Sequence, residues 1–301
     1  VSIAEKAKVD LPFMAELTGK DEEEIADDLT GVIFQVPGPL DEDGNATYVT
    51  ADEYLSGNVR QKLREAEDAA EMSPYFDANV RALKAAQPKD LEASEIDVRL
   101  GATWINKEYI QQFMEETMEI PFYQRRAIRV QFSEYTAEWH INGKNIPSYS
   151  NVAVNMTYGT DRANGLRILE DTLNLRDVRI YDTVTDPDGK ERRVLNQKET
   201  QLAQQKQQAI KDAFRDWIWQ DPDRREKLVT KYNELFNSTR PREYDGQHIR
   251  FAGMNPEIVL REHQRNAVAH ILYGGNTLLA HEVGAGKTFE MVAAAMESKR
   301  L

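Results

Sequence analysis

The strongest constraint on the fold is a glycine-rich loop near the end of the sequence. The apolar segment 276–280 leads into His281–Thr288, which reads His-Glu-Val-Gly-Ala-Gly-Lys-Thr, and the alanine-rich segment 289–296 follows. A strand, a glycine loop, Gly-Lys-Thr and a helix, in this order, suit phosphate binding. The glycines let backbone N–H groups surround phosphate oxygens, and the helix N-terminus adds its dipole. The alternative is a simple turn before a helix, and the order of the elements favours phosphate binding.

The residue types in the loop predict individual roles. Lys287 can reach the β- and γ-phosphates of a nucleotide and is the candidate catalytic residue. The hydroxyl of Thr288 can hold Mg²⁺, so ATP and Mg²⁺ are the expected cofactors. The other predicted loop contacts are Glu282, Gly284, Ala285 and Gly286.

An amphipathic helix over Leu260–Leu272 precedes the loop and contains Gln264. Taken alone, Gln264 would be interpreted as an exposed helix residue, but its spacing to Lys287 changes that interpretation. The helix resembles the Q-motif helix of superfamily 2 helicases, in which a glutamine recognises adenine. An amide side chain can pair with the donor and the acceptor of adenine together. The resemblance therefore implies that Gln264 contacts the base of ATP.

Together these two segments resemble the start of an Snf2-like helicase motor. In that family the loop typically reads Asp-Glu-x-Gly-x-Gly-Lys-Thr, so Glu282 matches the pattern and His281 replaces the aspartate. Three further segments resemble the large DNA methylase/helicase proteins of conjugative elements and phages: 270–281, 53–60 and 99–105. The resemblance implies a RecA-like P-loop lobe, DNA as a partner of the longer protein, and a methylase domain in the same polypeptide.

Other parts of such a motor do not occur in the sequence. No Asp-Glu motif follows the loop to complete Mg²⁺ binding, and the later motifs that supply arginines and hold DNA are missing. A methylase tetrapeptide of the Asn-Pro-Pro-Tyr type is also absent. We therefore expect a segment of an ATP-dependent DNA helicase or translocase that is inactive alone. The alternative is a noncatalytic scaffold or protein-interaction module that links a methylase domain to a motor.

The charge is distributed unevenly. The net charge is -13, and residues 1–90, with 9 basic and 20 acidic residues, contribute -11 of it. Nonspecific binding to nucleic acid depends on lysine and arginine replacing counterions. Residues 1–90 are therefore expected to be a solvated or protein-contacting module that does not bind DNA alone. Any DNA contact is expected from local patches in residues 91–301.

The pattern of elements predicts an α+β, multi-domain chain with four segments. Residues 1–90 are an acidic helical module, 91–196 a mixed α+β domain, 197–257 a helical connector, and 258–301 the truncated beginning of the helicase ATPase lobe.

In the first segment, short helices up to residue 30 and a hairpin of Val32–Val36 with Thr47–Val49 are compatible with a small winged-helix-like module. A helix from Thr50 to about Met72 and another from Pro74 predict a helical hairpin.

The central segment contains two predicted strand pairs. Ile128–Phe132 pairs with Glu138–Ile141, and Val178–Tyr181 pairs with Arg192–Leu195 through a turn at Asp186–Gly189. Aromatic residues at helical spacing after residue 197, such as Phe214 and Trp217, are interpreted as core residues rather than as base-stacking groups.

Cysteine is absent, which excludes disulfides, and no apolar run of 18 residues predicts a membrane span. No signal peptide is visible, so a cytoplasmic protein without membrane partners is expected.

Overall fold

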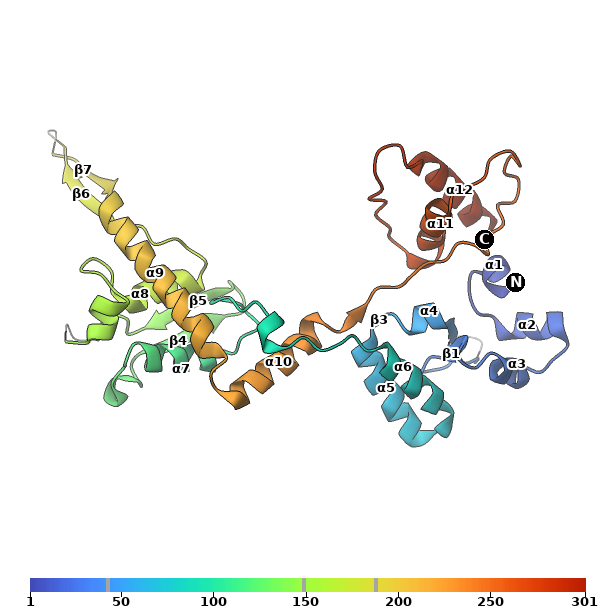
Figure 1. Cartoon of the computed structure of the whole chain (residues 1–301), viewed down its shortest axis with the longest axis horizontal. Helices are drawn as coiled ribbons and strands as arrows, with labels where there is room; N and C mark the ends of the chain where they lie inside the picture. Colours follow the sequence, from blue (N-terminus) through green and yellow to red (C-terminus); the bar gives the residue numbers. More distant parts are fainter. Residues whose placement is uncertain (42–43, 148–149, 187–188) are drawn as a thin grey trace. The chain divides into compact units, whose positions relative to one another are not determined.

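The computed structural model describes residues 1–41, 44–147, 150–186 and 189–301. It contains two compact units (Figure 1). Unit 1 combines Val1–Lys89 with Phe236–Leu301, and unit 2 comprises Asp90–Leu235. The two ends of the chain therefore fold together, whereas the sequence analysis divided the chain linearly. The α+β class predicted from the sequence is confirmed, because the described residues form helices and four separate two-stranded antiparallel sheets.

Unit 1 begins with three short helices and a hairpin, as predicted. The elements are α1 (Ser2–Lys6), α2 (Leu11–Thr18), α3 (Glu22–Asp28), β1 (Ile33–Gln35) and β2 (Tyr48–Thr50). Asp10 caps α2 by accepting a hydrogen bond from the Phe13 N–H at 3.0 Å, and Gly19 ends it with φ 71°. β1 and β2 are antiparallel, with Phe34 opposite Val49.

The expected continuous helix from Thr50 to Met72 is wrong. The structure has α4 (Ala51–Tyr54), the two-residue strand β3 (Gly57–Asn58) and α5 (Val59–Met72). The helix is interrupted because Gly57 adopts φ 71° and the Asn58 side chain caps α5 through the Gln61 N–H at 3.0 Å. A 3₁₀ turn, η1 (Pro74–Phe76), then leads into α6 (Asp77–Ala86).

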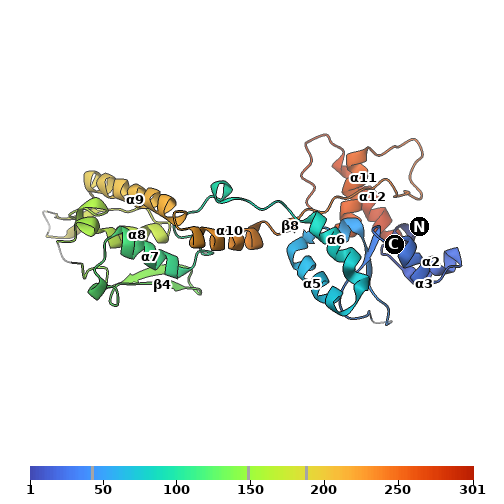
Figure 2. The same ribbon diagram turned by 60° about the horizontal axis from the view of Figure 1, so that its bottom comes forward.

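The predicted helical hairpin is confirmed, since α5 and α6 pack against each other (Figure 2). Its core joins the hairpin to β1: the rings of Phe34 and Tyr54 stack with centroids 5.0 Å apart. Asn79 of α6 donates a hydrogen bond to the Tyr54 hydroxyl at 2.9 Å. Val59, Ala66 and Leu83 complete the buried cluster.

The returning chain adds β8 (Thr239–Arg240), α11 (Glu262–Gly274) and α12 (Lys287–Arg300) to unit 1. β8 pairs with β3 in antiparallel register. α11 and α12 lie side by side in both ribbon views and bury Val268, Ala269 and Ala294 between them (Figures 1 and 2).

The strand expected at 276–280 is not formed. The segment has no regular secondary structure and belongs to none of the four sheets of the described residues. The physical reason is that a strand obtains its backbone hydrogen bonds from a neighbouring strand, and no described strand pairs with this segment. The loop before α12 is therefore held by contacts with side chains of α11 and not by a sheet.

Unit 2 is built around a large apolar core. The core lies among α7 (Lys107–Thr117), the pair β4 (Arg129–Ser133) and β5 (Glu138–Asn142), α8 (Gly165–Leu173), and α9 (Gln197–Ile218). α10 (Pro222–Phe236) follows, and Asp221 caps it through the Arg224 N–H at 2.7 Å. The unit also contains the short turns η2 (Ala93–Glu95) and η3 (Phe122–Gln124) and the π-helical turn η4 (Ala153–Thr157).

The aromatic residues of α9 belong to this core. Phe214 and Trp217 are buried, and both rings contact Phe113 of α7, with centroids 5.1 and 5.5 Å apart. The indole N–H of Trp217 donates to the Glu116 carboxylate at 2.6 Å. The interpretation of Phe214 and Trp217 as core residues is confirmed.

The first predicted strand pair of the central segment is confirmed as β4 and β5. The second is shifted: β6 (Tyr181–Thr185) pairs with β7 (Glu191–Leu195), so β6 begins where the prediction ended. Val178 and Ile180 instead donate backbone hydrogen bonds to side chains of α9, and Ile180 bonds the Thr200 hydroxyl at 3.0 Å. In the predicted turn, residues 187 and 188 lie outside the described residues.

None of the helices that the structure describes combines the length and apolar character needed to cross a membrane.

Candidate functional site

The glycine loop leads directly into α12. Gly284 and Gly286 have φ of 90° and 92°, a left-handed conformation that favours glycine. Gly286 is the N-cap, and the helix begins at Lys287. The backbone N–H groups of the first helical turn have no acceptor inside the helix. The N–H groups of Ala285 and Phe289 bond to the carbonyls of Glu282 and Gly286, whereas those of Lys287 and Thr288 have no acceptor in the described structure and lie at the positive end of the helix dipole.

Lys287 folds back over this loop. Its ammonium group donates to the carbonyl oxygens of His281 and Glu282 at 2.7 and 3.0 Å. Main-chain acceptors of the loop thus hold the Lys287 ammonium group against it. In the described part of the chain, no carboxylate pairs with this ammonium group. An anion in the loop would replace neutral carbonyl partners and would not have to break an ion pair.

Gln264 lies against the same loop. Its side chain is buried, and its Nε2 donates to the carbonyl of Ala285 at 3.1 Å. The other end of the amide, Oε1, accepts the N–H of Arg261 at 2.9 Å. A Cβ at Gly286 would lie only 2.3 Å from the Gln264 Nε2, so this contact requires glycine in the loop. Reading a base would require the amide to exchange these partners.

The remaining predicted residues are more exposed. The side chains of Glu282 and Thr288 both face solvent, and the Thr288 hydroxyl makes no hydrogen bond within the described residues. Ala285 contributes its carbonyl to Gln264 and also to His263, whose Nε2 lies 3.1 Å away. The structure therefore brings the loop and Gln264 together and leaves the Thr288 hydroxyl free.

Sequence reasoning missed Glu290. Its side chain is completely buried beneath the loop, and its Oε1 lies 2.9 Å from His281 Nδ1. Its second oxygen, Oε2, is buried without a partner in the described structure. The rings of His263 and His281 meet edge-on beside it, with centroids 5.5 Å apart. A signal was available: Glu290 shares a helix face with Ala294, so a carboxylate lies on the side of α12 that packs against α11.

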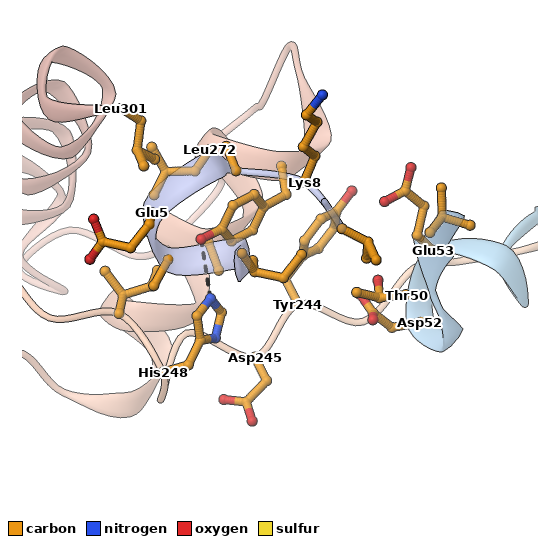
Figure 3. A pocket seen from close by; sticks show the side chains of 18 of the residues that line it. Glu5, Lys8, Thr50, Asp52, Glu53, Tyr244, Asp245, His248, Leu272 and Leu301 are labelled. Carbon is orange, nitrogen blue, oxygen red and sulfur yellow. Dashed lines mark hydrogen bonds between the residues drawn. The ribbon is translucent and has the colours of Figure 1, made fainter. Parts of the chain in front are cut away.

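A separate cavity of unit 1, about 1430 Å³, is lined by its N-terminal and returning segments (Figure 3). None of the predicted site residues lines it. Seven carboxylates line it against four lysine and arginine side chains, so its charge does not suit a polyphosphate. The His248 ring and the Tyr273 hydroxyl are hydrogen-bonded inside it at 3.1 Å, and burial raises the pKa of Tyr273.

Two family models match the chain. Residues 1–42 match the winged helix domain of a probable helicase, and residues 99–238 match a domain of unknown function, DUF8437. The first match covers α1 to α3 and β1, the part for which the sequence predicted a winged-helix-like module. The N-terminal part of this chain is thus similar to a helicase-associated domain.

The chain is also similar to "Defense against restriction protein B" of Escherichia phage P1. The two are 32% identical over 84 residues, which are 28% of this chain and 4% of the phage protein. The match thus covers only a small part of the relative's length. No solved structure matches this chain.

Proposed function

We propose that this chain is part of an ATP-dependent DNA helicase or translocase of a mobile genetic element, of the methylase/helicase type. Residues 258–301 supply its adenine-reading helix and its phosphate-binding loop. The observation that carries the proposal is the contact between Gln264 and the glycine loop, because the base-reading and the phosphate-binding residues are adjacent in space. The similarity of residues 1–42 to a helicase winged helix supports the same class of protein.

The residues present fit a nucleotide with Mg²⁺. The N–H groups at the start of α12 and the Lys287 ammonium would bind the phosphates, and the free Thr288 hydroxyl would hold Mg²⁺, which supplies charge neutralisation of the phosphate oxygens. Gln264 would position the base. The residues of this chain thus account for binding and orientation of the nucleotide.

In this proposal the winged-helix-like module contacts protein rather than DNA. Its third helix, α3, begins with Glu22, Glu23 and Glu24 and also contains Asp27 and Asp28. A helix that reads DNA needs side chains that are attracted to phosphates, and five carboxylates oppose this. DNA would be bound elsewhere on the chain and by the rest of the motor.

Replacing Gln264 with alanine is expected to reduce the preference for ATP over GTP. The experiment uses a protein that contains this chain within a complete motor, and measures competition of both nucleotides against a photoreactive ATP analogue. Glu262→Ala, an exposed position on the same helix, is the matched control. An unchanged preference in the Gln264 variant would remove the adenine-reading assignment.

The 301-residue chain itself is expected to bind Mg-ATP weakly at best and to show no ATPase activity. Because segment 276–280 is not held in a sheet, ordering of the loop would oppose binding. Calorimetry with Mg-ATP and a phosphate-release assay measure the two quantities. Micromolar binding with turnover that Lys287→Ala abolishes would show that this chain already forms a working site.

A further inference from the structure

Two adjacent aromatic side chains are exposed on a loop of unit 2. The loop comprises residues 121–127 between α7 and β4, and includes η3. Phe122 is 86% exposed and Tyr123 is 80% exposed. Large aromatic side chains usually contribute to cores or interfaces, because exposing their rings to water is unfavourable. The fold of unit 2 leaves this pair uncovered.

The loop is held in place by both of its ends. Ile120 and Ile128, which flank it, are buried in the core. Gln111 of α7 donates to the Ile128 carbonyl at 3.0 Å and accepts the N–H of Val130 at 2.7 Å. Within the loop, Arg125 donates through Nε to the Ile120 carbonyl at 3.1 Å. The two rings are therefore presented by an anchored backbone.

The same segment is basic in an acidic chain. Residues 120–133 contain three arginines and no aspartate or glutamate. Arg125 is paired with Glu115 at 3.3 Å. Arg126 and Arg129 are exposed, and neither has a carboxylate partner in the described parts of the chain. Two guanidinium groups without carboxylate partners thus lie in the same short segment as the exposed rings.

The strand register extends this polar surface. Val130 of β4 enters the core, so its neighbours Arg129 and Gln131 face solvent. Gln131 lies opposite His140 of β5, which is also exposed. The outer face of the β4–β5 pair therefore continues from the loop as a row of polar and charged side chains. It ends at Glu138, whose carboxylate lies 3.8 Å from the His140 ring and also pairs with Arg176.

We propose that the surface formed by Phe122, Tyr123, Arg126 and Arg129, here called the Phe122 surface, binds single-stranded DNA. Bases would stack on the two rings, and the two guanidinium groups would bind backbone phosphates, the combination by which proteins hold single strands without reading sequence. The choice of DNA rests on the proposed function, whereas the single-stranded form follows from the rings, because the bases of a duplex are already stacked on each other.

The composition of the surface favours a nucleic acid over a protein partner. Two rings provide far less apolar area than the roughly 800 Å² that each side of a stable protein interface buries. Unpaired arginines beside aromatic rings instead complement a polyanion that carries flat bases. The surface lies within the region that matches the domain of unknown function, to which it would assign a role.

The test is fluorescence anisotropy of a labelled 20-nucleotide oligo-dT with the full 301-residue chain, without nucleotide and at about 50 mM salt. The double variant Phe122→Ala/Tyr123→Ala is expected to weaken binding at least tenfold, in line with the known effect of removing stacking rings. The double variant Arg126→Gln/Arg129→Gln is expected to weaken binding. The slope of the logarithm of the binding constant against the logarithm of the salt concentration is expected to become shallower by about one to two.

Two variants serve as matched controls. Tyr135→Ala removes a fully exposed aromatic ring from the turn between β4 and β5, and Arg179→Gln removes an exposed arginine that has no carboxylate partner among the described residues. Both are expected to bind oligo-dT within twofold of the unmodified chain. All substituted side chains are exposed, so the thermal unfolding midpoint is expected to stay unchanged and serves as a check of folding.

Three results would overturn the proposal: no binding of oligo-dT by the unmodified chain, equal losses in the control variants, or tighter binding of duplex DNA or oligo-rU than of oligo-dT. Lys287→Ala is expected to leave oligo-dT binding unchanged, which separates this surface from the proposed nucleotide site. If the Gln264 variant keeps its nucleotide preference while the Phe122 surface variants lose DNA, the nucleotide assignment fails and the DNA surface stands.

Discussion

Replacing Lys287 with alanine is expected to abolish ATP hydrolysis in a protein that contains this chain within a complete motor. Among the described residues, the ammonium group is bonded to main-chain carbonyls and to no carboxylate, so in the proposed motor it would neutralise charge on the transferring phosphate. Loss of one such preorganised charged donor is expected to lower kcat by on the order of 10³-fold. Steady-state phosphate release at saturating Mg-ATP measures this.

Lys299→Ala is the control for this experiment. Lys299 is exposed in the last turn of the same helix, α12, and its removal changes the net charge equally. Its activity is expected to equal that of the unmodified protein. A Lys287 variant that keeps more than a tenth of the activity would exclude a catalytic role for this side chain.

Substituting His281 with aspartate, the residue that helicases of the resembled family have there, is expected to destabilise the α11–α12 part of unit 1. Glu290 is completely buried, and among the described residues its carboxylate is hydrogen-bonded to His281 alone, at 2.9 Å. Aspartate would place a second carboxylate beside it. Breaking a fully buried ion pair lowers the free energy of unfolding by about 3–5 kcal/mol. Because His281 is partly exposed, we expect the His281→Asp variant to lose about 2 kcal/mol of this free energy. Urea unfolding and amide exchange of α12 measure the loss.

A second substitution separates electrostatics from packing. Combining His281→Asp with Glu290→Gln removes one carboxylate and supplies an amide donor for the new aspartate, so most of the lost stability is expected to return. His281→Asn keeps a donor near Glu290 and is expected to cost less than His281→Asp. Equal destabilisation in all three variants would contradict the pairing.

The local elements were predictable because their signals are short-range. Asp10 before α2 is a side chain that caps a helix from the residue just outside it. Alternation of polar and apolar residues predicted β4 and β5 with their pairing. Where a local signal was overlooked, as at Gly57 and Asn58, the predicted helix was wrong because a left-handed glycine and a cap interrupt it.

The loop order was also readable in the sequence, since two glycines with positive φ precede a helix that begins at Lys287. The burial of Glu290 had one signal, its place on the helix face of Ala294, but a charged residue on a helix is by default assigned to the solvent face, so its burial was not predicted. Only the packing of α12 on α11 turns it inward, toward His281.

The amino-acid sequence by itself therefore determined the α+β class, the helical hairpin of α5 and α6, the β4–β5 pair and the glycine loop, since each depends on residues close together in the chain. The tertiary structure decided what depends on distant residues. It joined the two ends of the chain into unit 1 through β3 and β8, left segment 276–280 outside any sheet, and exposed Phe122 and Tyr123 on an anchored loop. Backbone pairing and burial are set by partners far away in the sequence, and a local pattern does not specify which partner is present.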